Sequence, residues 1–271
     1  MEKRKEVKRP LPPPPKPPSK FRAKPSRKAR ELAPKGKGRN MGRGSFALGL
    51  RHTYREVEAE LTKRRRITSD GTTTTVEEIS VTGMEEDDFA TRLHMDSLRI
   101  RLGLTDYLEV FADIGGAYRE FSEIGLAYGG GLRLNLFQVN GGWLRGFYGA
   151  LQGEYLGGEV EYEYTSSVGS KWRKEADWKE FVAKGELGMT RSWLAAYIGG
   201  AYFYYREDTE RQLLENLPPP FILYLLQDEL EEESLGAFGG IEVNLTPALL
   251  VNIEGQLISQ KSIFGTLEYH F

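Results

Sequence analysis

The last nine residues of the chain, 263–271, have the sequence IFGTLEYHF. Every second residue from Ile263 to Phe271 is apolar, aromatic or glycine, and the polar residues Thr266, Glu268 and His270 fall between them. A side-chain period of two is typical of a β-strand whose two faces meet different surroundings. The end of the chain is therefore predicted to be a strand with one apolar and one mostly polar face.

The same period recurs along the chain from residue 45 onward. Six further segments alternate clearly: 98–104, 108–114, 126–136, 181–189, 241–245 and 249–257. Three more segments, 46–61, 147–162 and 193–205, are predicted strands with less regular alternation. The total is about ten strands, and apolar lengths of about 9–11 residues suit tilted strands that cross a bilayer.

The predicted connections alternate between short and long. Short turns are expected at 105–106, 139–143, 190–192 and 246–247, and longer links at 62–89, 119–123, 165–175 and 207–233. This asymmetry is typical of outer-membrane barrels, which have short periplasmic turns and long external loops. An even strand count then puts both ends of the barrel on one side, which is predicted to be the periplasm.

A soluble, lipocalin-like barrel is the alternative, because alternation alone does not say which face points inward. The polar faces carry charges of both signs, which a narrow lumen can pair. Aromatic residues near strand ends, such as Trp178 and Tyr269, suit membrane interfaces. The fold class is therefore predicted to be an all-β, antiparallel, up-and-down transmembrane barrel. Its lumen charge network is predicted to consist of Arg99, Arg101, Glu109, Asp113, Arg133, Glu154, Lys184, Glu186, Glu242 and Glu254.

The C-terminal strand also carries a family resemblance. Leu267, Tyr269 and the final aromatic Phe271 are similar to the terminal assembly signal of bacterial outer-membrane β-barrel proteins. The resemblance implies insertion by the barrel assembly machinery, outer-membrane lipid as a partner and a periplasmic C-terminus. That family normally has a cleaved signal peptide. Residues 1–20 have a charged start without an apolar core, so no signal peptide is predicted in this sequence.

Residues 1–44 differ in composition from the predicted barrel, residues 45–271. They contain 16 Lys and Arg and three Glu, a net charge of 16 − 3 = +13, and nine of the 13 prolines. Such a segment is predicted to be a disordered tail. It is expected to act as a spacer, or as an arm that binds an anionic cell-wall polymer or lipid head groups. A single aromatic residue, Phe21, argues against a nucleic-acid partner.

Few residues suggest chemistry. The chain has no Cys and three His, so neither a metal nor a cofactor is predicted. His94 and Asp96 resemble a hydrolytic pair, but they share the parity of Leu98 and are expected to point away from the lumen. A non-enzymatic protein is therefore predicted, either a narrow channel or a structural envelope protein. The alternatives are a surface adhesion or receptor barrel that acts through loops 62–89 and 207–233, and a hydrolase at the barrel rim.

Overall fold

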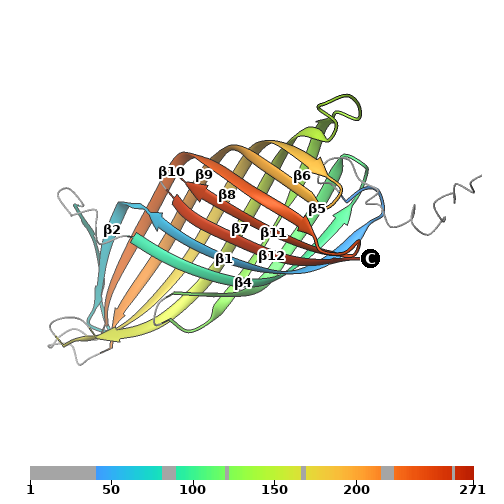
Figure 1. Cartoon of the computed structure of the whole chain (residues 1–271). Coiled ribbons are helices and arrows are strands. Elements are labelled where there is room, and N and C mark those ends of the chain that lie inside the picture. Colours follow the sequence, from blue (N-terminus) through green and yellow to red (C-terminus); the bar gives the residue numbers. More distant parts are fainter. Residues whose placement is uncertain (1–40, 81–89, 120–121, 166–168, 215–222, 258–259) are drawn as a thin grey trace, which may run out of the picture. The chain divides into compact units, whose positions relative to one another are not determined.

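The computed structural model describes residues 41–80, 90–119, 122–165, 169–214, 223–257 and 260–271 (Figure 1). The described residues form strands and turns, and no helix among them has the length and hydropathy to cross a membrane. The strands are β1 (Phe46–Glu58), β2 (Glu60–Ser69), β3 (Thr74–Ile79), β4 (Ala90–Gly103), β5 (Leu108–Tyr118), β6 (Gly125–Gln138), β7 (Phe147–Thr165), β8 (Lys171–Arg191), β9 (Leu194–Leu213), β10 (Leu223–Asn244), β11 (Leu249–Leu257) and β12 (Gln260–His270).

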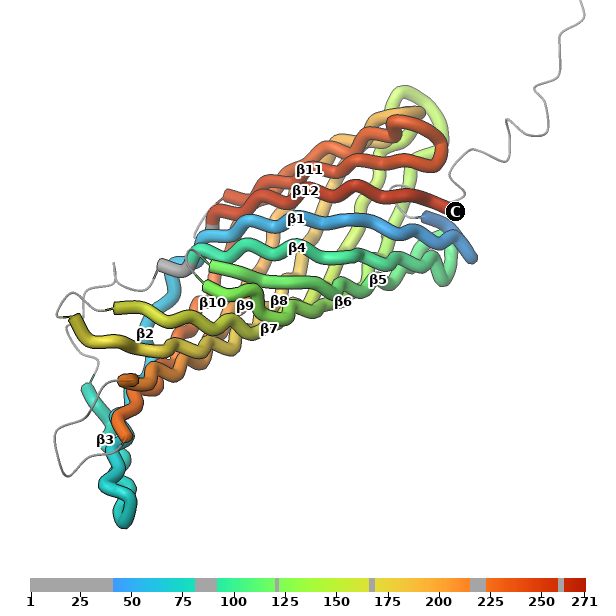
Figure 2. The backbone as a smooth tube through the Cα atoms, turned by 90° about the horizontal axis from the view of Figure 1, so that it is seen from below, coloured from blue at the N-terminus to red at the C-terminus, as the bar shows by residue number. Residues whose placement is uncertain are grey.

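Ten of these strands close into an antiparallel barrel, as the sequence predicts. Neighbouring strands pair in the order β1, β4, β5, β6, β7, β8, β9, β10, β11 and β12, and β12 pairs back with β1. Figure 2 shows this wall with β12, β1 and β4 side by side. The remaining two strands, β2 and β3, form a hairpin that continues from β1. Strand β2 pairs with the first half of β10, beyond the end of the β11–β12 hairpin.

Short turns join the strands at one end of the barrel, here called the short-turn end. Two of these turns share the pattern Leu-Thr-X-X-Leu, at Leu104–Leu108 and Leu245–Leu249. In each turn the threonine hydroxyl accepts hydrogen bonds from two backbone N–H groups, at 2.9–3.1 Å for Thr105 and 3.0–3.2 Å for Thr246. Side-chain acceptors of this kind stabilise tight turns, so the threonines help to fix the registers of both hairpins.

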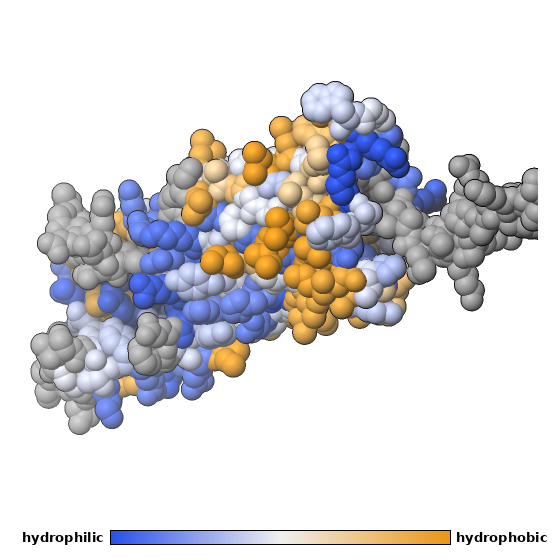
Figure 3. Space-filling view, in the orientation of Figure 1, coloured by the Kyte–Doolittle hydropathy of each residue, from blue (hydrophilic) through white to orange (hydrophobic). Residues whose placement is uncertain are grey.

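The outer wall of the barrel is apolar around the half nearest the short-turn end. Figure 3 shows several patches of orange residues on the face in view, with paler and blue residues between them. Its large side chains are exposed although the strands are well paired, for example Leu132 (50%) and Ile198 (72%). Exposed apolar surface of this extent indicates contact with hydrocarbon rather than water. The charged faces of the same strands point inward, which confirms the predicted transmembrane barrel and excludes the soluble alternative.

Four strands continue well beyond this apolar band. β7, β8, β9 and β10 are 19, 21, 20 and 22 residues long. Most of the predicted loops 165–175 and 207–233, and part of 62–89, are therefore strand, and the prediction of loops there was wrong. Residues 81–89 and 215–222, including the triple proline, lie outside the described residues. We call the parts of β7–β10 beyond the apolar band, with β2 and β3, the extension.

The extension has the opposite polarity to the membrane half. Its outward side chains are charged, whereas a cluster of apolar side chains is buried between its strands and the ends of β1, β4 and β5. Trp178, Leu156 and Val160 in this cluster are each 1% exposed. The prediction of Trp178 as a membrane-interface aromatic was therefore wrong, since it shares the inward parity of Glu180 and Lys184.

The last residues of the predicted tail already contact the barrel. Met41 is buried, and its backbone N–H donates to the Glu109 carboxylate inside the short-turn end at 3.4 Å. The Gly44 N–H donates to the Gly103 carbonyl at 2.7 Å. Gly44 has a φ of 73°, a conformation that favours glycine. Residues 41–44 thus belong with the barrel, and residues 1–40 lie outside the described residues.

Candidate functional site

The centre of the lumen is filled by two arginines and two carboxylates. Arg99 on β4 bridges Asp113 on β5, at 2.7 Å, and Glu154 on β7, at 2.9 Å. Arg51 on β1 reaches the same two carboxylates, at 3.3 Å to Asp113 and in a closer contact with Glu154. Inward residues of four strands therefore meet in one network. Each charge has opposite partners, as burial in a lumen requires.

Further ion pairs lie closer to the short-turn end. Arg101 on β4 bridges Glu109, at 2.7 Å, and Glu268 on β12. A second pair joins Arg133 on β6 to Glu186 on β8. Because β12 and β4 are the two neighbours of β1, the Arg101–Glu268 pair spans the seam at which the first and last strands meet.

A lysine completes the network on the opposite wall. The Lys184 ammonium lies 2.5 Å from a Glu254 oxygen, and the Tyr197 hydroxyl donates to the other oxygen at 2.8 Å. The Lys184 nitrogen also lies 4.9 Å from the centre of the Phe264 ring and 5.3 Å from that of Phe238. Aromatic faces attract cations where water is excluded, so the rings add to the stabilisation of this lysine.

All ten residues of the predicted lumen network lie inside the barrel, with Glu242 buried close enough to Arg101 to interact with it. Sequence reasoning missed Arg51, Arg55, Glu180 and Glu268. Arg55 pairs with Glu180 just below the apolar cluster of the extension. The parity of residues 46–61 was left open, although the inward series Ala47, Gly49, Arg51, Thr53 and Arg55 can be counted from Leu48 and Leu50. The network as a functional site stays a prediction.

Little space remains between these side chains. The cavity in the network has a volume of about 40 Å³ and is lined by residues such as Arg51, Gln152 and Glu254. That volume holds one or two water molecules. Beyond the network, the apolar cluster around Trp178 and Leu230 fills the interior again. The ionic network and the apolar cluster thus follow one another along the interior of the barrel.

A further buried ion pair lies at the far side of the apolar cluster. Arg119, which follows β5, donates both guanidinium nitrogens to Glu207 on β9, at 2.9 and 2.5 Å. The hydroxyls of Tyr205 and Thr209 donate to the same carboxylate, at 2.5 and 3.0 Å. Burial alone raises the pKa of Glu207, but Arg119, these hydrogen bonds and Lys174 outweigh it and lower the pKa to about 2. Glu207 is thus ionised at neutral pH.

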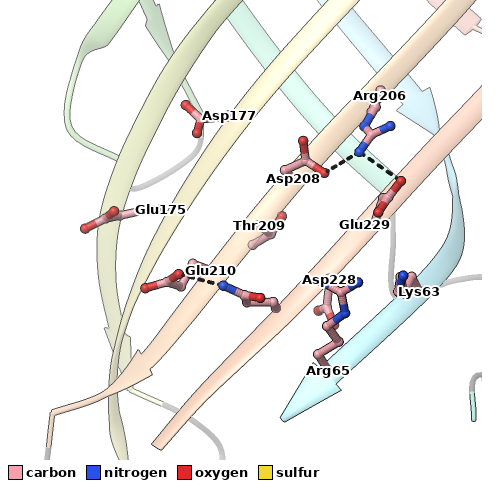
Figure 4. A pocket seen from close by; sticks show the side chains of 11 residues that line it. Lys63, Arg65, Glu175, Asp177, Arg206, Asp208, Thr209, Glu210, Asp228 and Glu229 are labelled. Carbon is pink, nitrogen blue, oxygen red and sulfur yellow. Dashed lines mark hydrogen bonds and ion pairs between the residues drawn. The ribbon is translucent and has the colours of Figure 1, made fainter. Parts of the chain in front are cut away.

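The outer face of the extension carries a polar groove of about 350 Å³ (Figure 4). Figure 4 shows Arg206 between Asp208 and Glu229, at 3.3 and 2.9 Å. The groove spans β8, β9, β10 and β2, and its lining has more acids than bases. The lining residues are Lys63, Arg65, Glu175, Asp177, Arg206, Asp208, Thr209, Glu210, Gln227, Asp228 and Glu229.

Two acidic runs, residues 85–88 and 228–233, stand out in the sequence. Asp228 is held by two arginines, Arg64 at 2.6 Å and Arg211. The other run, residues 85–88, lies outside the described residues. Among the residues that the structure describes, no group of three His, Asp or Glu side chains is arranged to hold a metal ion.

His94 and Asp96 lie on the face that their parity predicts. His94 and Asp96 point outward from the barrel, and Asp96 pairs with His52 of the neighbouring strand at 2.7 Å rather than with His94. His270 points inward and lies 3.5 Å from Glu268. The one serine next to Asp96, Ser97, is buried on the inward side. The arrangement therefore brings no serine hydroxyl to the His52–Asp96 pair.

No known protein family and no curated protein sequence match this chain. Solved structures similar to it include the outer-membrane protease OmpT of Escherichia coli, with 9% identity, 84% of this chain and 97% of that chain covered, and a TM-score of 0.43. The translocator domain of the autotransporter NalP of Neisseria meningitidis has 9% identity, coverage of 90% and 94%, and a TM-score of 0.40. Ail of Yersinia pestis has 9% identity, coverage of 84% and 99%, and a TM-score of 0.31. All three resemble this chain in structure over 84–90% of its length.

Proposed function

We propose that this protein is a closed, non-enzymatic structural barrel of the outer membrane. The observation that supports this function is the filled lumen. Its ionic layer leaves about 40 Å³, and the apolar layer around Trp178 follows directly. An ion that crossed would have to separate buried pairs such as Arg99–Asp113 and then pass an apolar layer, and each step costs several kcal/mol. The sequence predicts either a narrow channel or a structural envelope protein. The filled lumen favours the structural protein.

Conductance across a planar bilayer tests this proposal. The full chain is expected to insert without stepwise conductance. Insertion is checked separately by a gel shift between heated and unheated samples, because folded barrels migrate differently before boiling. A double variant, Arg99→Ala with Arg51→Ala, removes two large side chains from the ionic layer and serves as a control for a partly opened lumen. Regular conductance steps from the unaltered chain would contradict the proposal.

In the proposed orientation the extension lies outside the cell, and the short-turn end faces the periplasm with the tail and Phe271. The asymmetry of the connections supports this orientation, since outer-membrane barrels have short turns on the periplasmic side and longer segments on the extracellular side. A cysteine introduced at Thr72, in the β2–β3 turn, is expected to react with a membrane-impermeant maleimide on intact cells. A cysteine at Thr105 in a short turn is the matched control and is expected to react only after lysis. The reverse pattern would contradict the orientation.

The tail then lies in the same compartment as the cell wall. Its charge of +13 over residues 1–44 supports binding to an anionic polymer, which becomes weaker as salt increases. Co-sedimentation of the full chain with purified cell-wall sacculi is expected to decrease between low and high salt. A chain with eight of the tail's Lys and Arg changed to Gln is expected to remain in the supernatant. Equal sedimentation of both chains would contradict binding of the cell-wall polymer by the tail. It would favour the prediction that the tail is a spacer.

The groove favours a second function, a surface adhesion or receptor barrel. It is the larger of the two cavities described here and lies on the outer face of the extension. The lining has more carboxylates than cations, so we propose a cationic ligand. Fluorescent polylysine is expected to bind the micelle-bound protein, and Asp208→Asn with Glu210→Gln is expected to weaken binding several-fold. Heparin serves as the anionic comparison, and a preference for heparin would contradict this second function.

A further inference from the structure

A polar gap interrupts the lipid-facing wall on β1 and β4. Counted from the short-turn end, the outward residues of these strands are apolar as far as Leu50 and Leu98. The next outward residues are His52 and Asp96, which are direct cross-strand neighbours. They are well exposed, with side-chain values of 51% and 63%. The gap is therefore on the surface that meets lipid and is separate from the lumen network.

The gap lies within the apolar wall and not above it. On the side of the short-turn end, the paired row across β5, β4, β1 and β12 contains Ile114, Leu98, Leu50 and Leu267. On the far side, the corresponding row contains Tyr118, His94, Tyr54 and Ile263. One row is aliphatic and the other mostly aromatic. Asp96 is thus enclosed between two rows of lipid-facing side chains, near the aromatic edge of the band.

The neighbours of the pair leave room beside it. In the same row, Gly116 follows Asp96 on β5 and Gly265 follows His52 on β12. The side chain of Ile124 occupies the space over Gly116, whereas a Cβ atom placed on Gly265 would meet nothing within 4 Å. The gap is therefore open on the β12 side, next to the His52 ring.

The hydrogen bond fixes what the pair offers to a ligand. His52 Nδ1 lies 2.7 Å from Asp96 Oδ1, and a carboxylate only accepts, so the proton is on Nδ1. The second Asp96 oxygen has no partner among the described residues. Asp96 thus presents a free acceptor, and a matching ligand has several N–H donors and a positive charge.

Aromatic rings pack against one another along the far side of the gap. The His94 ring stacks on Tyr118, with centroids 5.0 Å apart and an interplanar angle of 7°, and lies 5.0 Å from the Tyr54 ring. The centroids of His94 and His52 are 6.0 Å apart. Aromatic rings at this level suit the boundary between acyl chains and head groups. A ligand in the gap would therefore lie at the boundary between acyl chains and head groups.

An ionisable side chain that faces lipid is costly, and the fold does not need this one, since Asp96 belongs to no buried network. We propose that the His52–Asp96 pair binds the primary ammonium of a membrane lipid, with an ethanolamine head group as the simplest case. The ammonium donates to the free Asp96 oxygen, and the His52 Nδ1–H holds the carboxylate in place through its other oxygen. A phosphate supplies acceptors where donors are needed, and a choline has no N–H. The proposal rests on the membrane insertion proposed above.

The test uses the full chain in phosphatidylcholine nanodiscs that contain equal minor fractions of phosphatidylethanolamine and phosphatidylglycerol. Native mass spectrometry then identifies the lipids retained after collisional release. Retention of phosphatidylethanolamine is expected to exceed that of phosphatidylglycerol by roughly tenfold, as one charge-assisted contact allows. Asp96→Asn is expected to abolish the preference. Glu56→Gln, which removes an outward carboxylate of the same β1–β4 wall that is already paired with Arg92, is the matched control and is expected to keep it.

Each outcome bears on one proposal. Equal retention of the two lipids by the unaltered chain, or a preference that survives Asp96→Asn, would overturn the ethanolamine site. A cross-linked dimer that is lost in Asp96→Asn would assign the gap to a second copy instead and would also overturn it. The heated and unheated gel shift is recorded for every variant. Loss of that shift in the unaltered chain would contradict membrane insertion itself, so the two failures are distinguishable.

Discussion

The membrane half of the barrel and the extension are built from the same strands with opposite polarity. On β8, the outward residues Leu187 and Phe181 are apolar and the inward Lys184 is charged, whereas farther along the outward Asp177 is charged and the inward Trp178 is apolar. The period of two continues unbroken through the change. The difference teaches that alternation specifies the two faces of a strand, and that the solvent outside specifies which face is apolar.

The largest effect is expected from the interior of the extension. Trp178→Ala removes a fully buried ring from the apolar cluster and is expected to cost about 3–5 kcal/mol of unfolding free energy. The loss is expected to be confined to the extension, because the ionic layer of the membrane half does not contain this ring. Amide hydrogen exchange should become faster in residues 171–178 and stay slow in 181–189.

Trp143→Ala is the control for this truncation, since Trp143 is 84% exposed in a turn at the short-turn end. Its effect is expected to stay within about 0.5 kcal/mol. If Trp178→Ala accelerated exchange equally in both parts of β8, the two regions would unfold as one unit. The membrane half and the extension would then differ in polarity but not in their stability to unfolding.

The next largest difference between the membrane half and the extension is expected from a charge placed on the outer face. Leu132→Arg puts a guanidinium on the lipid-facing wall of β6 and is expected to cost about 2–4 kcal/mol. Glu161→Arg puts a guanidinium on the outward face of β7 in the extension and breaks an exposed ion pair with Arg173, and about 1 kcal/mol or less is expected. Urea unfolding in lipid vesicles gives both values. Similar costs for the two variants would mean that the apolar band does not contact hydrocarbon.

A smaller effect is expected from acid. The lowered pKa of Glu207, about 2 against an ordinary 4.5, stabilises the extension fully above pH 4.5, and this stabilisation is lost as pH falls through 2. A charge-assisted bond of this kind is worth about 1.5–3 kcal/mol. Protease cleavage within residues 206–213 is expected to rise between pH 4.5 and 2, measured with an acid-active protease.

Glu207→Gln is the control for the acid response. The variant is expected to be more susceptible at neutral pH and to lack the additional rise attributed to Glu207. An unchanged acid profile in Glu207→Gln would assign the response to other carboxylates, such as those of the lumen, and would remove this distinction between the regions.

Much of the membrane half could be predicted from the sequence. The parity of Arg99, Arg133 and Glu254 places them inside because Leu98, Leu132 and Ile253 must face lipid. The extension could not be predicted in the same way. Glu175 and Glu229 face outward beside the buried Ala176 and Leu230, so a search for apolar outward faces stops at the bilayer and takes these segments for loops.

The partners of the ionic side chains could not be predicted from the sequence either. The pairing of Asp96 with His52 rather than with His94, two residues away, depends on the register of β1 against β4. The same register brings Arg51 into the reach of Asp113 and Glu154. Registers of strands joined by a long connection are weakly constrained by local sequence, since only the closed barrel fixes them.

The junction of β1 with β12 sets the order in which the wall can be completed. Ala47 pairs with His270, and no hairpin connects the two strands, whereas β4 through β10 join their neighbours through local turns or links. Bringing chain ends together over such a separation is the slow part of folding. Until the final residues arrive, a growing chain has two open strand edges, the kind of surface at which polypeptides aggregate. A chain truncated before Gln260 would be left with both edges permanently unpaired, and so would be a natural substrate for quality-control proteases.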